Sequence, residues 1–206
     1  MRPGRVNIWP HFSFVPIYAA ILPGHSHSAA LPAIARRSWR VVGRTFFSPP
    51  HTQATLPQLI READASFSVT GSRREDFSVR GPDGVLLHGW KVRAANPNGS
   101  WILAFHGVAD NRIGVIMQAE FLLRAGYNIV MMDARAHGES EGPMATYGWL
   151  ERNDTRATVD ALIATEHPLH IFALGESMGA GIALQSAEVD LRIEAVVAEA
   201  SFASLR

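Results

Sequence analysis

Residues 169–187 read LHIFALGESMGAGIALQSA, and the pattern inside this stretch decides the fold. The apolar run Leu169–Leu174 is followed by G-x-S-x-G at residues 175–179, and small and apolar residues continue to Ala187. A five-residue pattern can occur by chance, but a strand, a tight turn and a helix in succession form the setting that a reactive serine on such a turn requires. The sequence therefore predicts that Ser177 lies between a buried strand and a helix over residues 178–187.

Glycines flank this serine at the two positions where bulky side chains would collide across so tight a turn, Gly175 and Gly179. The amino end of the following helix directs free N–H groups towards the serine and favours a developing negative charge. We therefore predict that Ser177 is a nucleophile. The alternative is a glycine-rich connection between strand and helix without chemistry.

Other apolar runs surround this stretch and have the composition of strands that are buried on both faces of a parallel sheet. Helical segments of suitable length separate them. The expected strands are Trp101–Phe105, Asn128–Asp133, Leu169–Leu174 and Glu194–Glu199, and the expected helices span about 114–125, 150–166 and 178–187.

A hairpin precedes these units. Two short runs, Glu75–Arg80 and Val85–Val92, are joined by the turn Gly-Pro-Asp-Gly at residues 81–84. A hairpin followed by alternating strands and helices predicts an α/β fold, a mostly parallel sheet with an N-terminal antiparallel hairpin.

The second motif is His106-Gly107-Val108, directly after the expected strand 101–105. In hydrolases with a serine on such a turn, one oxyanion-hole N–H comes from the residue after the nucleophile and another from the loop after an earlier strand. Met178 and Val108 occupy these positions, and Gly107 allows the loop to lie close to the serine. The alternative is that His-Gly only ends the strand.

The third motif is DARAHGES at residues 133–140. Asp133 and Arg135 are expected to brace this loop through charge-assisted hydrogen bonds. His137 is a candidate base, but the order of catalytic residues expected for such a fold favours a supporting role near the site.

These three motifs and the closing EASFASL resemble the α/β-hydrolase superfamily, in particular its serine-aminopeptidase-like and BEM46-like branch. The resemblance covers about Asp76–Arg206. It implies a strand order in which the HG strand lies beside the serine strand. It also implies a serine hydrolase, esterase-like or peptidase-like, that acts on an ester, thioester or amide through an acyl-enzyme on Ser177, without a cofactor.

The base and its orienting acid are missing from the expected order, which is Ser, then Asp or Glu, then His. No histidine follows Ser177 in the sequence, and Glu199 is interpreted as a structural or rim residue. His106 and His137 are weak candidates for a substitute base. We therefore expect a fragment that lacks the last strands and helices of the fold and is inactive or very weak alone. The alternative is a non-catalytic binding protein of the same fold.

Residues 1–50 contain no acidic residue, and Arg2 and Arg5 precede the apolar stretch Phe12–Leu22. This outline is that of a signal peptide interrupted by proline, and a poorly ordered leader is favoured over an export signal or membrane anchor. Residues 51–73 are expected to be a linker and 74–206 a partial hydrolase domain. A cytoplasmic location is favoured, and membrane contact is expected only if the leader is a signal or anchor.

The amino-acid composition limits the classes of partner and cofactor that can be expected. Nineteen basic residues balance nineteen acidic ones, which gives no attraction to nucleic acid. The sequence has no cysteine, so disulfides and thiol nucleophiles are excluded. No metal constellation and no G-x-G-x-x-G dinucleotide motif are visible. A small-molecule or peptide acyl substrate is the expected partner.

Overall fold

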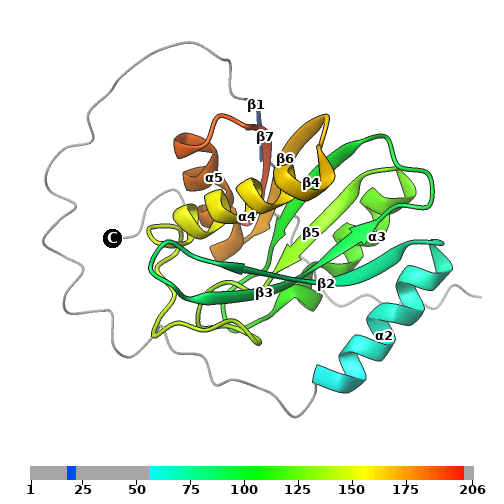
Figure 1. Ribbon diagram of the computed structural model, residues 1–206, viewed down its shortest axis with the longest axis horizontal. Helices are drawn as coiled ribbons and strands as arrows, with labels where there is room; N and C mark the ends of the chain where they lie inside the picture. Colours follow the sequence, from blue (N-terminus) through cyan, green and yellow to red (C-terminus); the bar gives the residue numbers. More distant parts are fainter. Residues whose placement is uncertain (1–17, 22–55, 202–206) are drawn as a thin grey trace, which may run out of the picture.

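The computed structural model describes residues 18–21 and 56–201. They form a seven-stranded sheet with the order β1-β7-β6-β4-β5-β3-β2 (Figure 1). The strands are β1 (Tyr18–Ile21), β2 (Arg73–Arg80), β3 (Leu86–Arg93), β4 (Ser100–Phe105), β5 (Asn128–Met132), β6 (His170–Glu176) and β7 (Ile193–Glu199). The helices are α2 (Leu56–Val69), the 3-10 turn η3 (Arg112–Val115), α3 (Ile116–Arg124), α4 (Glu151–Glu166) and α5 (Met178–Val189).

The central strands β5, β4, β6 and β7 are parallel, and β3 joins them antiparallel to β5. β2 and β3 form the expected hairpin, whose turn is closed by a hydrogen bond of 2.9 Å from the Gly84 N–H to the Gly81 carbonyl. The predicted α/β fold with its N-terminal hairpin is confirmed. β4 lies directly beside β6, as the family resemblance implies.

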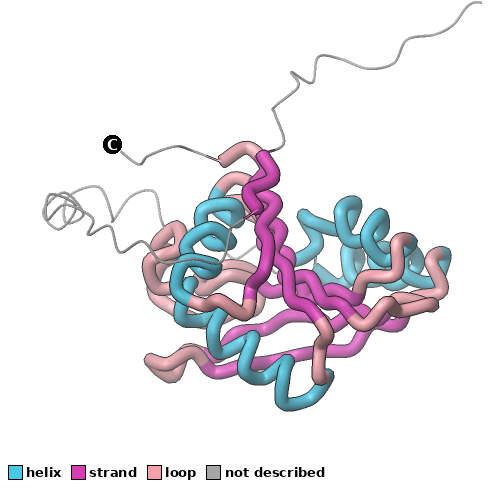
Figure 2. Tube along the Cα trace, turned by 90° about the horizontal axis from the view of Figure 1, so that it is seen from above, coloured by secondary structure: helices cyan, strands magenta, loops and turns pink. Residues whose placement is uncertain are grey.

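Helices cover both faces of the sheet, so the domain has three layers (Figure 2). Successive side chains of a strand point to opposite faces. Along β4, Trp101, Leu103 and Phe105 therefore pack in the core beneath α4 and α5. Ile102 and Ala104 pack in the core beneath α2 and α3. Every residue of β4 is buried, which explains its uninterrupted apolar sequence.

The strands and helices expected from Glu75 onwards are all present, with small shifts at their ends. The helix expected from residue 114 begins instead as η3 at Arg112, because the Asn111 side chain accepts a hydrogen bond from the Ile113 N–H and caps this turn. β6 continues through Gly175 to Glu176, so the strand runs directly into the turn that carries Ser177.

Helix α2 lies within the range 51–73, for which the sequence indicated a linker. Its Ala63 and Phe67 are buried, and the Phe67 ring meets Trp90 of β3 edge-on at 6.3 Å between centroids. In the range 1–50, residues 18–21 form β1, antiparallel to β7, and the rest of the expected leader lies outside the described residues. In the described ranges, no helix combines the length and hydrophobicity needed to cross a membrane.

Candidate active site

Ser177 occupies the turn between β6 and α5 in a backbone conformation that side chains rarely adopt, with φ 52° and ψ −110°. Such a conformation costs about 1–3 kcal/mol and persists only where the surroundings impose it. The Ser177 N–H donates a 2.9 Å hydrogen bond to the Glu199 carbonyl, and the Ser177 carbonyl accepts bonds of 3.1 and 3.3 Å from the N–H groups of Ala180 and Gly181. The turn is therefore fastened to β7 on one side and to α5 on the other.

The flanking glycines are required by contacts that only a missing Cβ permits. A Cβ at Gly175 would lie 2.1 Å from the carbonyl oxygen of Gly179, which is the predicted collision across the turn. A Cβ at Gly179 would lie 2.2 Å from the carbonyl oxygen of Phe105, so this glycine is needed for close approach to the end of β4. The sequence suggested that Gly179 avoids a collision across the turn, whereas the structure shows that it allows close approach to the end of β4.

The HG loop after β4 lies beside this turn. A Cβ added at Gly107 would meet the Cβ of Ser177 at 3.8 Å, an ordinary contact distance. Gly107 therefore leaves open the space next to the serine side chain and is not needed to avoid a clash. The Val108 side chain is 39% exposed, whereas Met178, the first residue of α5, is fully buried. The first N–H groups of a helix have no acceptor within that helix.

His106 is buried at the end of β4, and both of its ring nitrogens are engaged. Nε2 accepts a 3.0 Å hydrogen bond from the Ala134 N–H, and Nδ1 lies 2.7 Å from the Gly107 carbonyl oxygen, which can only accept. The ring is therefore the neutral tautomer with a proton on Nδ1. Burial lowers the pKa of His106 in agreement with this state.

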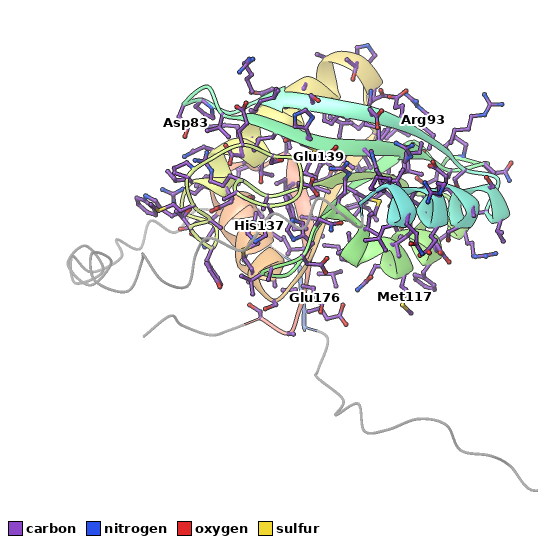
Figure 3. The ribbon with its side chains drawn as sticks, turned by 90° about the horizontal axis from the view of Figure 1, so that it is seen from below. Asp83, Arg93, Met117, His137, Glu139 and Glu176 are labelled. Atoms are coloured by element: carbon purple, nitrogen blue, oxygen red, sulfur yellow. The ribbon has the colours of Figure 1, made fainter. Side chains whose placement is uncertain are left out.

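His137 is buried in the loop after β5 and is engaged in the same way. Nε2 accepts from the Ala109 N–H at 3.3 Å, and Nδ1 lies 3.0 Å from the Arg135 carbonyl oxygen. Its ring centroid is 5.1 Å from that of His106. Neither histidine is thus available to take a proton from Ser177 in this structure. Figure 3 labels His137 together with Glu176, the residue before the serine.

Asp133 and Arg135 both form buried ion pairs, but with different partners. The Asp133 carboxylate accepts from the Arg112 N–H at 2.7 Å, from the Glu139 N–H at 2.9 Å and from the Arg112 guanidinium. Arg135 binds Asp154 of α4 through two nitrogens, at 2.7 and 2.8 Å. Both residues connect the loop after β5 to other elements.

Arg112 was not singled out by the sequence analysis, although it holds this region together. Its guanidinium binds Asp133 and Glu139 and lies 4.6 Å from the centroid of the Trp90 ring. The side chain is almost completely buried. A single arginine without a surrounding motif carries no signal of this role in one sequence.

Three carboxylates lie close to the serine turn. Burial raises the pKa of Glu176, and the negative charges of Glu199 and Asp110 raise it further. Glu199 is paired with Glu176 in the β6–β7 register, and its carboxylate accepts a bond of 3.4 Å from the Gln118 side chain of α3. Among the described residues, no group of three or more possible ligands is arranged to hold a metal ion.

Four parallel strands end at the edge where these loops meet, and the loop after each one contains a non-glycine residue with positive φ. They are Ala109, Ala136, Ser177 and Ala200, with φ of 60°, 60°, 52° and 51°. Strained backbone of this kind clusters at functional sites in proteins. The arrangement can present a serine hydroxyl and main-chain N–H groups to a small electrophile.

Comparison with known proteins identifies the family of the chain. Residues 96–205 match the family described as serine aminopeptidase, S33. The uncharacterised protein YqkD of Bacillus subtilis (strain 168) is 32% identical over 129 residues, which are 60% of this chain and 42% of YqkD. The matched region thus spans less than half the length of that relative.

Solved structures of hydrolases share the fold. The esterase Pf2001 of Pyrococcus furiosus superposes with a TM-score of 0.57 at 30% identity, over 62% of this chain and 51% of the esterase. XC6422 of Xanthomonas campestris, described as an α/β serine hydrolase without a lid, superposes with a TM-score of 0.51 at 21% identity, over 57% of this chain and 56% of that one. At this identity, the second likeness supports the fold alone.

Proposed function

Because the chain belongs to the serine aminopeptidase (S33) family of α/β-hydrolases, we propose that it is the nucleophile-bearing part of a serine hydrolase that forms an acyl-enzyme on Ser177. The observation that carries the proposal is the conformation of Ser177, at φ 52° on a turn anchored to β7 and α5. A structural turn has no need to hold a serine in a strained conformation at the start of a helix.

The reaction follows from the groups around the turn. The Ser177 Oγ attacks the acyl carbon of an ester, thioester or amide, and the carbonyl π electrons move onto its oxygen. The N–H groups of Val108 and Met178 donate to this oxyanion. Collapse of the intermediate breaks the bond to the leaving group, which departs with the proton taken from Ser177. Water then hydrolyses the acyl-enzyme.

The proton requires a base, and we propose that this base and its acid come from sequence that is not part of this chain. No histidine follows Ser177, and both nitrogens of His106 and of His137 are engaged by main-chain groups. Without a base, the serine hydroxyl is a weak nucleophile. We therefore expect this chain alone to acylate slowly and to turn over far more slowly than a complete relative.

A second candidate function is that of a binding protein with the same fold. The observation in its favour is the same lack of an available base. Such a protein would bind small molecules or a peptide at the edge that carries Ser177 without forming a covalent bond.

Acylation by an activated ester distinguishes the serine hydrolase from the binding protein. We would mix the chain with p-nitrophenyl acetate, measure the nitrophenol released and locate any adduct by peptide mass spectrometry. The nucleophile proposal expects acetylation of Ser177, lost in Ser177→Ala and kept in Ser68→Ala, a matched change at an exposed serine of α2. No adduct on Ser177 would favour the binding protein, whereas rapid sustained turnover would contradict the missing base.

A further inference from the structure

The HG loop (residues 106–112) is fastened to the loop after β5 by three hydrogen bonds between a side chain and a main-chain N–H. The Ala134 N–H donates to His106 Nε2 at 3.0 Å, and the Ala109 N–H donates to His137 Nε2 at 3.3 Å. A third bond of 2.7 Å joins the Arg112 N–H to Asp133. The fastened positions 106, 109 and 112 are three residues apart.

Of these three bonds, the one to His137 holds the most strained part of the loop. Ala109 has φ 60°, in the left-handed region that side chains disfavour. Val108 precedes it directly, so the orientation of the Val108 N–H depends on how Ala109 is held. Among the described residues, His137 is the one hydrogen-bond acceptor that the Ala109 N–H has.

The protonation state of His137 makes it an acceptor at this point. Nδ1 faces the Arg135 carbonyl oxygen at 3.0 Å, and a carbonyl can only accept, so the ring proton lies on Nδ1. Nε2 then carries a lone pair that faces the Ala109 N–H. The ring itself is buried beside His106, so it has little freedom to turn away.

From this geometry we propose that His137 is a positioning residue that holds Ala109, and through it the Val108 N–H, in the orientation that receives the oxyanion. The effect of His137 on catalysis rests on the proposed function. The hydrogen bond between His137 and the Ala109 N–H is independent of that function. His137 acts by accepting from a main-chain N–H of the HG loop and takes no proton from Ser177.

Two substitutions distinguish the effect of the hydrogen-bond acceptor of His137 from the effect of the volume of its ring. His137→Phe keeps a buried ring but removes the acceptor. His137→Gln places a carbonyl oxygen close to the position of Nε2 and so keeps it. The matched control is His170→Phe, because His170 is exposed on β6 and has an acidic partner on β7, Glu194.

The first readout is hydrogen exchange of the Ala109 amide, followed by nuclear magnetic resonance. We expect faster exchange in His137→Phe and protection close to that of the unmodified protein in His137→Gln and His170→Phe. Equal exchange in all four proteins would overturn the proposal.

The second readout is single-turnover acylation of Ser177 by p-nitrophenyl acetate across a range of ester concentrations. Loss of one oxyanion donor lowers the rate of acyl transfer by about 100-fold or more. A donor that is displaced but present is expected to lower the limiting rate by about 10-fold in His137→Phe, with little change in the half-saturating concentration. Equal losses in the Phe and Gln variants would show that ring volume matters and would overturn the role of the acceptor.

A measurement on the unmodified protein covers the case in which His137→Phe does not fold. Scalar coupling across the hydrogen bond between the Ala109 nitrogen and His137 Nε2, with His137 protonated on Nδ1, is expected in labelled protein. A proton on Nε2 instead would overturn the proposal. If Ser177 is not acylated at all, the proposed function fails, while the coupling and exchange data still decide the role of His137.

Discussion

The main-chain N–H of Ser177 donates a 2.9 Å hydrogen bond to the carbonyl oxygen of Glu199, so the serine turn is fastened to the end of the neighbouring parallel strand. The residues on either side of this bond are linked as well. Glu176 and Glu199 are partners in the β6–β7 register, and Ala200, after Glu199, has positive φ like Ser177. The ends of β6 and β7 therefore form one structural unit, and changes in one are expected to affect the other.

Gly175→Ala is expected to lower the free energy of unfolding by about 3 kcal/mol or more, because the new Cβ would meet main-chain atoms that cannot move aside. The nearest is the Gly179 carbonyl oxygen, at 2.1 Å. Urea unfolding measures the loss. The matched control is Gly107→Ala, whose Cβ would lie at an ordinary 3.8 Å from the Cβ of Ser177. It is expected to fold with a change below about 1 kcal/mol but to acylate Ser177 more slowly, and equal losses of stability would contradict this account.

Asp133→Ala is expected to lower the free energy of unfolding by about 3–5 kcal/mol, because it leaves the buried Arg112 guanidinium without its main counter-charge. It also removes the acceptor of two main-chain N–H groups. The control is Asp160→Ala, which breaks an ion pair with Arg192 at the surface and is expected to cost at most about 1 kcal/mol. Chemical denaturation of both variants tests the difference, and similar costs would show that the buried pair has no special importance.

Glu176→Gln is expected to stabilise the protein at neutral pH. Burial and the charges of Glu199 and Asp110 raise the pKa of Glu176, so the folded state holds its proton more tightly than the unfolded state does. The wild-type protein therefore loses stability as the pH rises from the ordinary pKa of 4.5 through the raised value. The melting temperature of Glu176→Gln should exceed that of wild type at pH 8 and converge with it near pH 4. An equal difference at both pH values would contradict the electrostatic cause, and exposed Glu188→Gln is the control.

His106→Gln is expected to make stability less sensitive to acid. Burial lowers the pKa of His106, so below the ordinary value of 6.5 the unfolded state binds a proton that the folded state excludes. Wild-type stability should then fall as the pH decreases from 6.5. The glutamine side chain can still accept a hydrogen bond from the Ala134 N–H. The hydrogen bond to the Gly107 carbonyl is lost, which lowers the free energy of unfolding by about 1 kcal/mol. Urea unfolding between pH 5 and 8 should show a flatter dependence in this variant than in exposed His170→Gln.

Much of the fold is visible in the sequence because strands buried on both faces and short turns leave local patterns. The hairpin at residues 73–93, the order of strands and helices from β4 to β7 and the position of Ser177 between β6 and α5 were all predicted and are confirmed. Helix α2 was missed, although Leu56, Ile60, Ala63 and Phe67 recur at helical spacing. Its packing against Trp90 and α3 shows that it belongs to the core. The roles of Ser177, Val108 and Met178 in catalysis stay predictions.

The sequence by itself determined where the reactive turn lies, because a strand, two spaced glycines and a helix are contiguous and their steric requirements are local. Only the tertiary structure decided the partners: that Arg112 binds Asp133, that Arg135 binds Asp154, and that His106 and His137 are both engaged by main-chain groups. These contacts join loops after different strands, and the pairing of charges and hydrogen bonds across loops depends on the sheet that brings the strand ends together.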